Sequence, residues 1–133
     1  EMWGNCMNKA VEYLLDETER LDYSVEQEDG NVFLISTFSP AGQDCNASID
    51  TEDNAELFIN NIRAYAKDFD VSFETYLWLD SNGHGRNGAP YDMKDVYEDM
   101  KWWQNSLEKL ANILEIILSE YKFLDRRKDK MDK

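Results

Sequence analysis

The chain is short of basic residues and of long hydrophobic runs. Its 133 residues include 14 Lys and Arg against 28 Asp and Glu, which gives a formal net charge of −14. A protein surface with this negative charge repels phosphate backbones and anionic lipid, which argues against direct binding to DNA, RNA or membranes. The same field attracts a basic protein surface, including one that normally holds nucleic acid. No apolar run approaches the roughly 20 residues of a membrane span and no secretory signal is recognisable, so we expect a cytoplasmic protein.

Cysteine and histidine are scarce, which limits the chemistry that the chain can perform. Cys6 and Cys45 are the only cysteines and lack metal-ligand spacing, so reduced thiols are expected. His84 is the only histidine, so a His-based metal cluster has no other member, and no positioned partner is visible for general-base catalysis. The sequence therefore predicts no catalytic residue, no metal and no cofactor, and a protein that is not an enzyme.

Glycines are concentrated in residues 83–88, which satisfy the G-x-G-x-x-G pattern of dinucleotide sites. Such a site needs a parallel βαβ unit whose helix begins at the pyrophosphate. Here Pro90 and Asp92 separate the glycines from the next helix, and no strand follows that helix. We therefore interpret residues 81–90 as a connecting loop.

The hydrophobic pattern predicts one α+β domain. Helical spacing of apolar residues from Met7 to Leu21 indicates a first helix, and two strand-like runs flank the hairpin signal Asp29-Gly30. A third alternating run, 45–49, completes an antiparallel three-stranded meander. A second helix, with Thr51 or Asp53 as its cap and an apolar stripe from 55 to 69, is expected to cover the sheet.

Residues 70–80 are ambiguous, because they alternate like a strand while Asp70 can cap a short helix; we favour the helix. The final element is a long helix over residues 92–124, which would be roughly 48 Å long. Its a and d heptad positions are apolar throughout: Met93, Val96, Met100, Trp103, Leu107, Leu110, Leu114, Ile117, Tyr121 and Leu124.

A helix of this length exceeds what one small sheet can cover, so part of its stripe requires another partner. We expect a homo-oligomer, most simply a homodimer. The interface is predicted to consist of Trp103, Leu107, Leu110, Leu114, Ile117 and Tyr121.

The ends of the chain differ from the domain. Residues 1–6 are expected to be a cloning remnant or a disordered start, because Glu1 precedes Met2. The domain then covers residues 7–124, and residues 125–133 form a charged tail. Residues 1–121 carry a net charge of −17 and residues 122–133 a net charge of +3, so the acidity belongs to the domain.

Two acidic clusters on helices are candidates for binding a partner. Like charges three or four residues apart destabilise a helix, so such clusters indicate either a functional field or a need for solubility. The first cluster is Asp92, Asp95, Glu98 and Asp99, and the second is Glu12, Asp16 and Glu19.

Part of the chain resembles a family of small acidic proteins carried by phages and mobile elements of gut bacteria. The resemblance covers about residues 53–118 and lies in the runs 64–71 and 76–79, the pair Ala89-Pro90 and the helix 95–114. It implies a setting in which such proteins antagonise host defence, as anti-restriction and anti-CRISPR proteins do, some by imitating DNA. The α-β-β-β-α order of residues 7–69 also parallels the double-stranded RNA-binding domain, but the basic groups that would hold phosphate are missing.

These observations favour a non-enzymatic inhibitor of a host defence nuclease, of the anti-CRISPR or anti-restriction type, with an acidic surface that imitates DNA. Its expected partner is a basic protein surface rather than nucleic acid or membrane. The alternative is an oligomeric protein-interaction or regulatory module that works through the long apolar helix.

Overall fold

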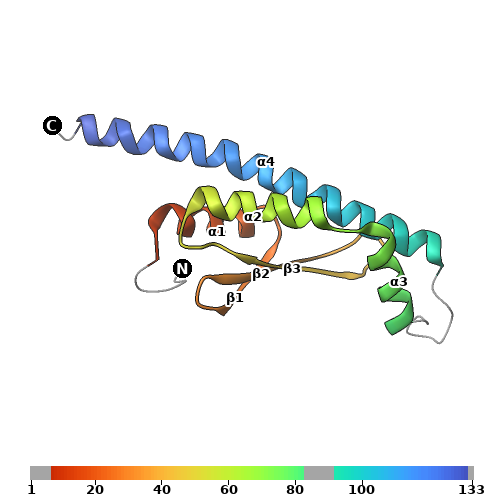
Figure 1. Ribbon diagram of the computed structural model, residues 1–133. Helices are drawn as coiled ribbons and strands as arrows, with labels where there is room; N and C mark the ends of the chain where they lie inside the picture. Colours follow the sequence, from red (N-terminus) through yellow and green to blue (C-terminus); the bar gives the residue numbers. More distant parts are fainter. Residues whose placement is uncertain (1–6, 83–91, 132–133) are drawn as a thin grey trace.

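The computed structural model describes residues 7–82 and 92–131, which form four helices and three strands (Figure 1). The α+β class, the order of the elements and the long C-terminal helix agree with the sequence prediction. The elements are α1 (Lys9–Arg20), β1 (Ser24–Asp29), β2 (Val32–Phe38), β3 (Asp44–Asp50), α2 (Ala55–Asp68), α3 (Val71–Asn82) and α4 (Met93–Met131).

The three strands form an antiparallel sheet in the order β1-β2-β3. The predicted hairpin between β1 and β2 is confirmed, and Gly30 takes the positive φ of 55° that its turn requires. Side chains on one face of the sheet are buried, while the opposite face carries mostly polar and acidic residues and stays open. The buried strand residues are Val25, Phe33, Ile35, Cys45, Ala47 and Ile49.

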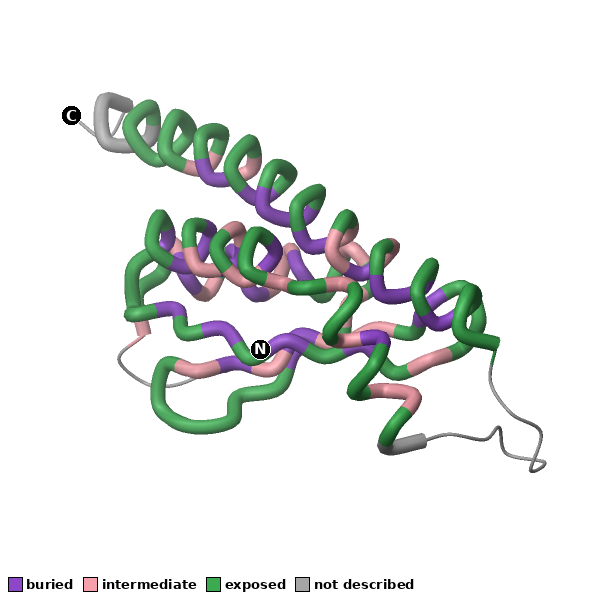
Figure 2. Tube along the Cα trace, turned by 45° about the vertical axis from the view of Figure 1, so that its right-hand side comes forward, coloured by how far each residue is buried: buried purple, intermediate pink, exposed green. Residues whose placement is uncertain are grey.

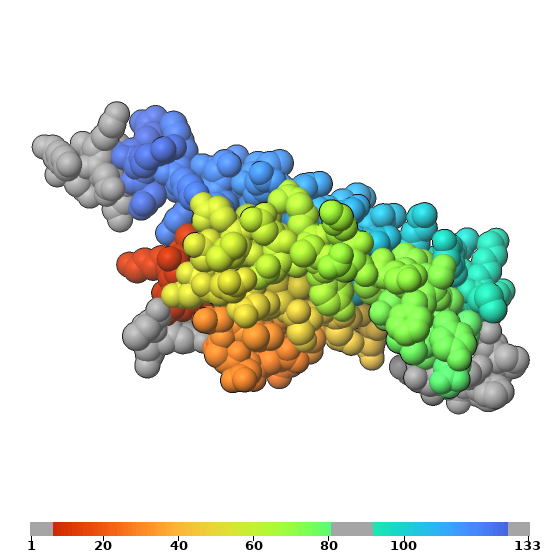
Figure 3. Space-filling view, in the orientation of Figure 1, coloured from red at the N-terminus to blue at the C-terminus, as the bar shows by residue number. Residues whose placement is uncertain are grey.

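Helices α1 and α2 cover the buried face of the sheet, and α4 crosses over both (Figures 1 and 2). The apolar stripe of α4 packs on the other helices and is buried from Val96 to Leu118. The first and last positions of the predicted stripe, Met93 and Leu124, are 66% and 63% exposed. The C-terminal part of α4 extends beyond the rest of the molecule (Figure 3).

The structure answers the open question about residues 71–79 and corrects the predicted cap of α2 and the predicted end of α4. Residues 71–79 are helical, as favoured. The cap of α2 is Asn54, whose side chain accepts from the Leu57 amide at 3.0 Å, whereas Asp53 accepts from the Asn8 amide at 2.7 Å. The long helix was predicted to end at residue 124 and to be followed by a charged tail, but α4 continues to Met131.

Several predictions lie outside the described residues. These are the predictions for residues 1–6 and for the part of the predicted connecting loop from residue 83 to residue 90. The first two residues of that loop, 81 and 82, belong to α3 instead. Within the described residues, no helix combines the length and apolarity needed to cross a membrane.

Candidate partner-binding surface

Helix α3 and the start of α4 lie side by side at one end of the molecule (Figures 1 and 3). The side chain of Asp70 caps α3 by accepting from the Phe73 amide at 3.1 Å. In the same way the Asp92 side chain accepts from the Lys94 amide at 2.9 Å at the start of α4. Both acids therefore have a structural role at positive helix ends, which is where sequence reasoning expects carboxylates.

An apolar cleft of about 380 Å³ separates the two helices. Polar groups contribute little to its walls, and among the described residues Lys94 supplies the one charged side chain of the lining. The lining residues are Ser72, Thr75, Tyr76 and Leu79 of α3 and Met93, Lys94 and Tyr97 of α4.

Large apolar side chains are exposed on both helices; Tyr76, Met93 and Tyr97 line the cleft, and Phe73 and Leu77 lie elsewhere on α3. Tyr76 is 63% exposed and Met93 66% exposed, and α3 packs chiefly on α4, so its outer face has no covering element in the described residues. An apolar group of this kind, bordered by polar residues, is typical of a protein-binding surface. We call Phe73, Tyr76, Leu77, Met93 and Tyr97 the α3–α4 patch.

The residues around the α3–α4 patch are acidic. Residues 68–82 and 92–99 include eight Asp and Glu but one base, Lys94. Lys94 lies 4.0 Å from Glu98, and both side chains are largely exposed, so this ion pair contributes little to stability. Asp92, Asp95 and Glu98 are all exposed and so can contact a partner, as the sequence predicts for them.

Asp99 is the exception in the first acidic cluster. It is 5% exposed, and its Oδ2 accepts a hydrogen bond of 2.6 Å from Ser39 Oγ in the turn after β2. The same Ser39 hydroxyl accepts from the Gln43 amide at 2.8 Å. Asp99 therefore ties α4 to this turn, and its predicted role as a partner-binding residue is wrong.

Cys45 lies in the buried face of the sheet near Asp99. Burial, followed by the negative charges of Asp99 and Asp44, raises the pKa of the Cys45 thiol to about 12. The thiol is therefore protonated at neutral pH and is a poor nucleophile. Cys45 is a free thiol, as expected, whereas Cys6, for which the same was expected, lies outside the described residues.

The second acidic cluster lies on α1, away from α3 (Figure 1). Glu12 and Asp16 are half-buried and Glu19 is exposed. The structure therefore does not bring the two predicted clusters together into one surface.

The predicted oligomer interface is largely internal. Trp103, Leu107, Leu110 and Leu114 are at most 2% exposed because α1 and α2 pack on them within the same chain. A second copy cannot reach these four side chains, so their assignment to an interface is corrected. Ile117 and Tyr121 are half-buried against the same core, and Tyr121 contacts Tyr13 of α1 with ring centroids 4.8 Å apart.

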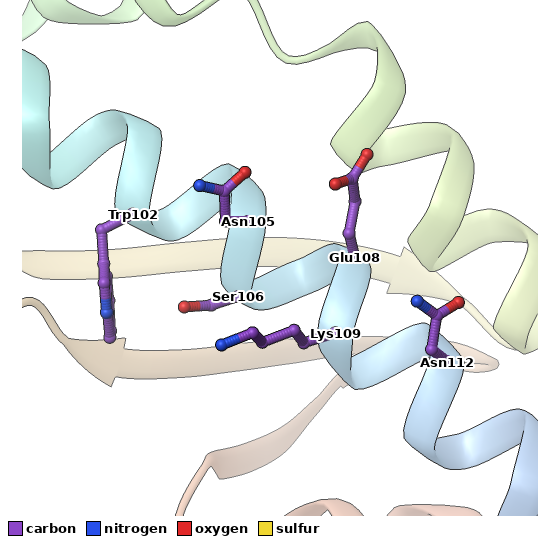
Figure 4. Close-up of a pocket in the computed structure, with 6 residues that line it drawn as sticks. All are labelled: Trp102, Asn105, Ser106, Glu108, Lys109 and Asn112. Carbon is purple, nitrogen blue, oxygen red and sulfur yellow. The ribbon is translucent and has the colours of Figure 1, made fainter.

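A shallow groove of about 370 Å³ runs along the middle of α4 (Figure 4). Trp102, Ser106 and Lys109 point to one side of the helix, and Asn105, Glu108 and Asn112 to the other. The six residues that line it therefore do not converge on one point, as an enzyme site requires. Among the described residues, no group of three or more His, Cys, Asp or Glu is placed to hold a metal ion.

Comparisons with protein families, with curated proteins and with solved structures find no match for this chain. The assignment of a site consequently depends on the geometry and charge of the chain itself. The α3–α4 patch with its acidic surroundings is the surface best suited to a partner, and sequence reasoning missed its apolar part. The sequence did contain a signal for the apolar part. Apolar residues occur on all sides of α3, so a helix that packs on one neighbour must leave some of them exposed.

Proposed function

We propose that the protein acts without catalysis, as an inhibitor that binds a basic, nucleic-acid-binding surface of another protein. The carboxylates of Asp92, Asp95 and Glu98 would take the places of phosphates on that surface. The observation that carries the proposal is the exposed α3–α4 patch beside these three exposed carboxylates.

The charges support a basic partner. A net charge of −14 attracts a cationic surface and accelerates its association at low salt. Placing carboxylates in the first turns of α4 costs little, since the helix dipole favours negative charge there. Glu98 lies one turn farther in, where this benefit fades, so a functional role accounts for it better than helix stability.

The apolar side chains support binding to a protein rather than a purely electrostatic encounter. Tyr76, Tyr97 and Met93 are of the residue types that are enriched in protein interfaces. They would supply affinity that survives physiological salt, whereas exposed ion pairs alone are screened. The resemblance to acidic proteins of mobile elements suggests a host defence nuclease as the kind of partner.

The test compares inhibition of plasmid cleavage by a panel of purified RNA-guided and restriction nucleases. The variant Asp92→Asn, Asp95→Asn, Glu98→Gln removes three charges and keeps a good cap at residue 92. We expect it to inhibit at least roughly tenfold more weakly than the parent. Its melting temperature should stay close to that of the parent, because none of the three side chains is buried.

A matched control removes the same number of charges from the open sheet face and its turn, with Glu26→Gln, Asp29→Asn and Asp44→Asn. Unchanged inhibition by this control would assign the effect to α4 rather than to net charge. If the α4 variant inhibits as well as the parent, or if no nuclease of the panel is inhibited by the parent, this function is wrong.

An oligomeric interaction module is the second candidate. It is favoured by exposed apolar residues in the C-terminal half of α4, among them Ile116 at 62% and Leu124 at 63%. A salt titration of partner binding separates the two candidates. Binding by phosphate mimicry weakens steeply with ionic strength, whereas binding through an apolar helix face does not.

A further inference from the structure

A second heptad repeat runs along α4, on a flank beside the stripe that packs on α1 and α2. At its N-terminal end Trp102 also packs against the chain's own core and Ser106 hydrogen-bonds Tyr23, whereas the rest of the repeat faces away from the core. Its residues alternate in steps of four and three, which is the spacing of a two-stranded coiled coil. Ile113, Ile116 and Phe123 are 39%, 62% and 53% exposed. We call this set the outer seam: Trp102, Ser106, Lys109, Ile113, Ile116, Glu120, Phe123 and Arg127.

The outer seam is exposed from Lys109 to Arg127 and partly covered at its N-terminal end. Lys109, Glu120 and Arg127 are exposed, and Trp102 and Ser106 are half-buried. In Figure 4 the Trp102, Ser106 and Lys109 side chains point away from Glu108 and Asn112. The Asn112 side is occupied, because Asn112 Oδ1 accepts from Arg63 of α2 at 2.9 Å. The seam from Trp102 to Arg127 is about 37 Å long at about 1.5 Å per residue.

We propose that a second copy of this chain covers the outer seam, with the two α4 helices antiparallel and the two-fold axis midway between Ile113 and Ile116. In this register Ile113 of one copy meets Ile116 of the other in two central layers. Lys109 then meets Glu120 in the next layer on each side. Farther out, Ser106 meets Phe123, and Trp102 meets Arg127.

Each outer layer of this register is chemically matched. The Lys109 and Glu120 side chains have opposite charges, and the Arg127 guanidinium can stack on the Trp102 ring. Arg127 already lies 5.8 Å from the centre of the Phe123 ring within one copy, so it is placed on the seam side of the helix.

Two other arrangements of the same helix bring like charges together. In a parallel pair, Lys109 would face Lys109, and Glu120 would face Glu120. Shifting the antiparallel axis to midway between Ile116 and Glu120 would set Lys109 against Arg127. An axis midway between Lys109 and Ile113 would avoid like charges but would lose the Lys109–Glu120 pairs. Charge complementarity therefore favours the arrangement centred on the two isoleucines over these three.

This interface differs from the one that the sequence predicted. The predicted residues form the stripe that packs on α1 and α2, whereas the outer seam lies on a neighbouring flank of α4. The inference does not depend on the proposed inhibitory function, since it uses the other half of α4.

Charge reversal tests both the dimer and its register, using sedimentation equilibrium of the full chain from low to high micromolar concentration. Lys109→Glu alone and Glu120→Lys alone each create two repulsive pairs per dimer. We expect each to raise the Kd of dimerisation roughly tenfold. The double variant restores opposite charges between the copies and should return the Kd to within about threefold of the parent.

The rescue cannot arise within one copy. Lys109 and Glu120 are eleven residues apart, or about 16.5 Å along the helix, which is too far for an ion pair. Glu108→Lys is the matched control, because Glu108 points to the other side of α4, and it should leave the Kd unchanged. Circular dichroism verifies that all four variants keep the helical content of the parent.

The remaining outcomes would overturn the proposal. A parent protein that is monomeric over the whole concentration range excludes the dimer. A double variant that dimerises no better than the single variants excludes this register. If Glu108→Lys weakens dimerisation as much as Lys109→Glu does, the effect comes from net charge and not from the seam.

Discussion

Asp99 shows how one carboxylate of an acidic helix can have a structural role. By spacing alone it belongs with Asp92 and Asp95, since the three lie within eight residues at the start of α4. The difference is tertiary, because the turn after β2 meets α4 at Asp99 and donates the Ser39 hydroxyl to it at 2.6 Å. A helical pattern cannot reveal such a contact between residues 60 positions apart.

The Ser39–Asp99 hydrogen bond gives a prediction at this scale. Ser39→Ala should lower the free energy of unfolding by about 1–3 kcal/mol, because it leaves a buried carboxylate without this donor. It also removes the acceptor of the Gln43 amide. Urea denaturation measures the change, and Ser24→Ala, at an exposed strand position, serves as the control. A loss below about 0.5 kcal/mol would show that water replaces the hydroxyl at no cost.

At the scale of elements, the sequence predicted types and order well and boundaries less well. The cap of α2 was missed because a local turn precedes the helix, in which Glu52 and Asp53 adopt positive φ angles of 50° and 49° and the Asp53 side chain accepts from the Asn8 amide. Asn54 then takes the cap position. Such a local turn is not visible in the apolar spacing that predicted the helix.

The stripe of α4 was read correctly as apolar but assigned to the wrong partner. Periodicity specifies which residues share a face and does not tell whether another copy or the same chain covers them. The helix is indeed too long for the sheet, but α1, α2 and α3 together cover it from Val96 to Leu118. The α3–α4 patch and the outer seam became apparent only from the exposure of each side chain in the folded chain.

The two kinds of apolar position on α4 should respond differently to truncation. Leu114 is fully buried, so Leu114→Ala should lower the free energy of unfolding by about 2–5 kcal/mol. Ile116 is 62% exposed, so Ile116→Ala should change it by no more than about 0.5 kcal/mol. Urea denaturation at low protein concentration keeps dimerisation out of the comparison. Equal losses for both variants would contradict the burial of the stripe within one copy.

At the scale of the whole molecule, charge is distributed unevenly and the fold preserves this polarity. Residues 1–121 have a net charge of −17, whereas residues 122–133 have six bases against three acids. Residues 122–131 of this segment form the end of α4, where cations compensate the negative end of the helix dipole. One of its bases, Lys122, pairs with Glu56 at the start of α2. The sequence alone showed that residues 1–121 are acidic and that the C-terminal residues are basic. It did not show that the basic residues lie on the end of a helix that extends beyond the domain.

This polarity leads to a prediction about nucleic acid. We expect no saturable binding of duplex DNA, single-stranded DNA or RNA at physiological salt, because a domain with a net charge of −17 repels phosphates and gains no net counterion release on binding. At low salt the end of α4 can attract a phosphate backbone weakly through Arg126 and Arg127. Fluorescence anisotropy with labelled oligonucleotides at both salt concentrations measures this, and Arg126→Glu with Arg127→Glu should abolish any low-salt signal. Saturable binding at physiological salt that persists in this variant would contradict the charge argument, and with it the inference that the partner of this protein is a basic protein surface.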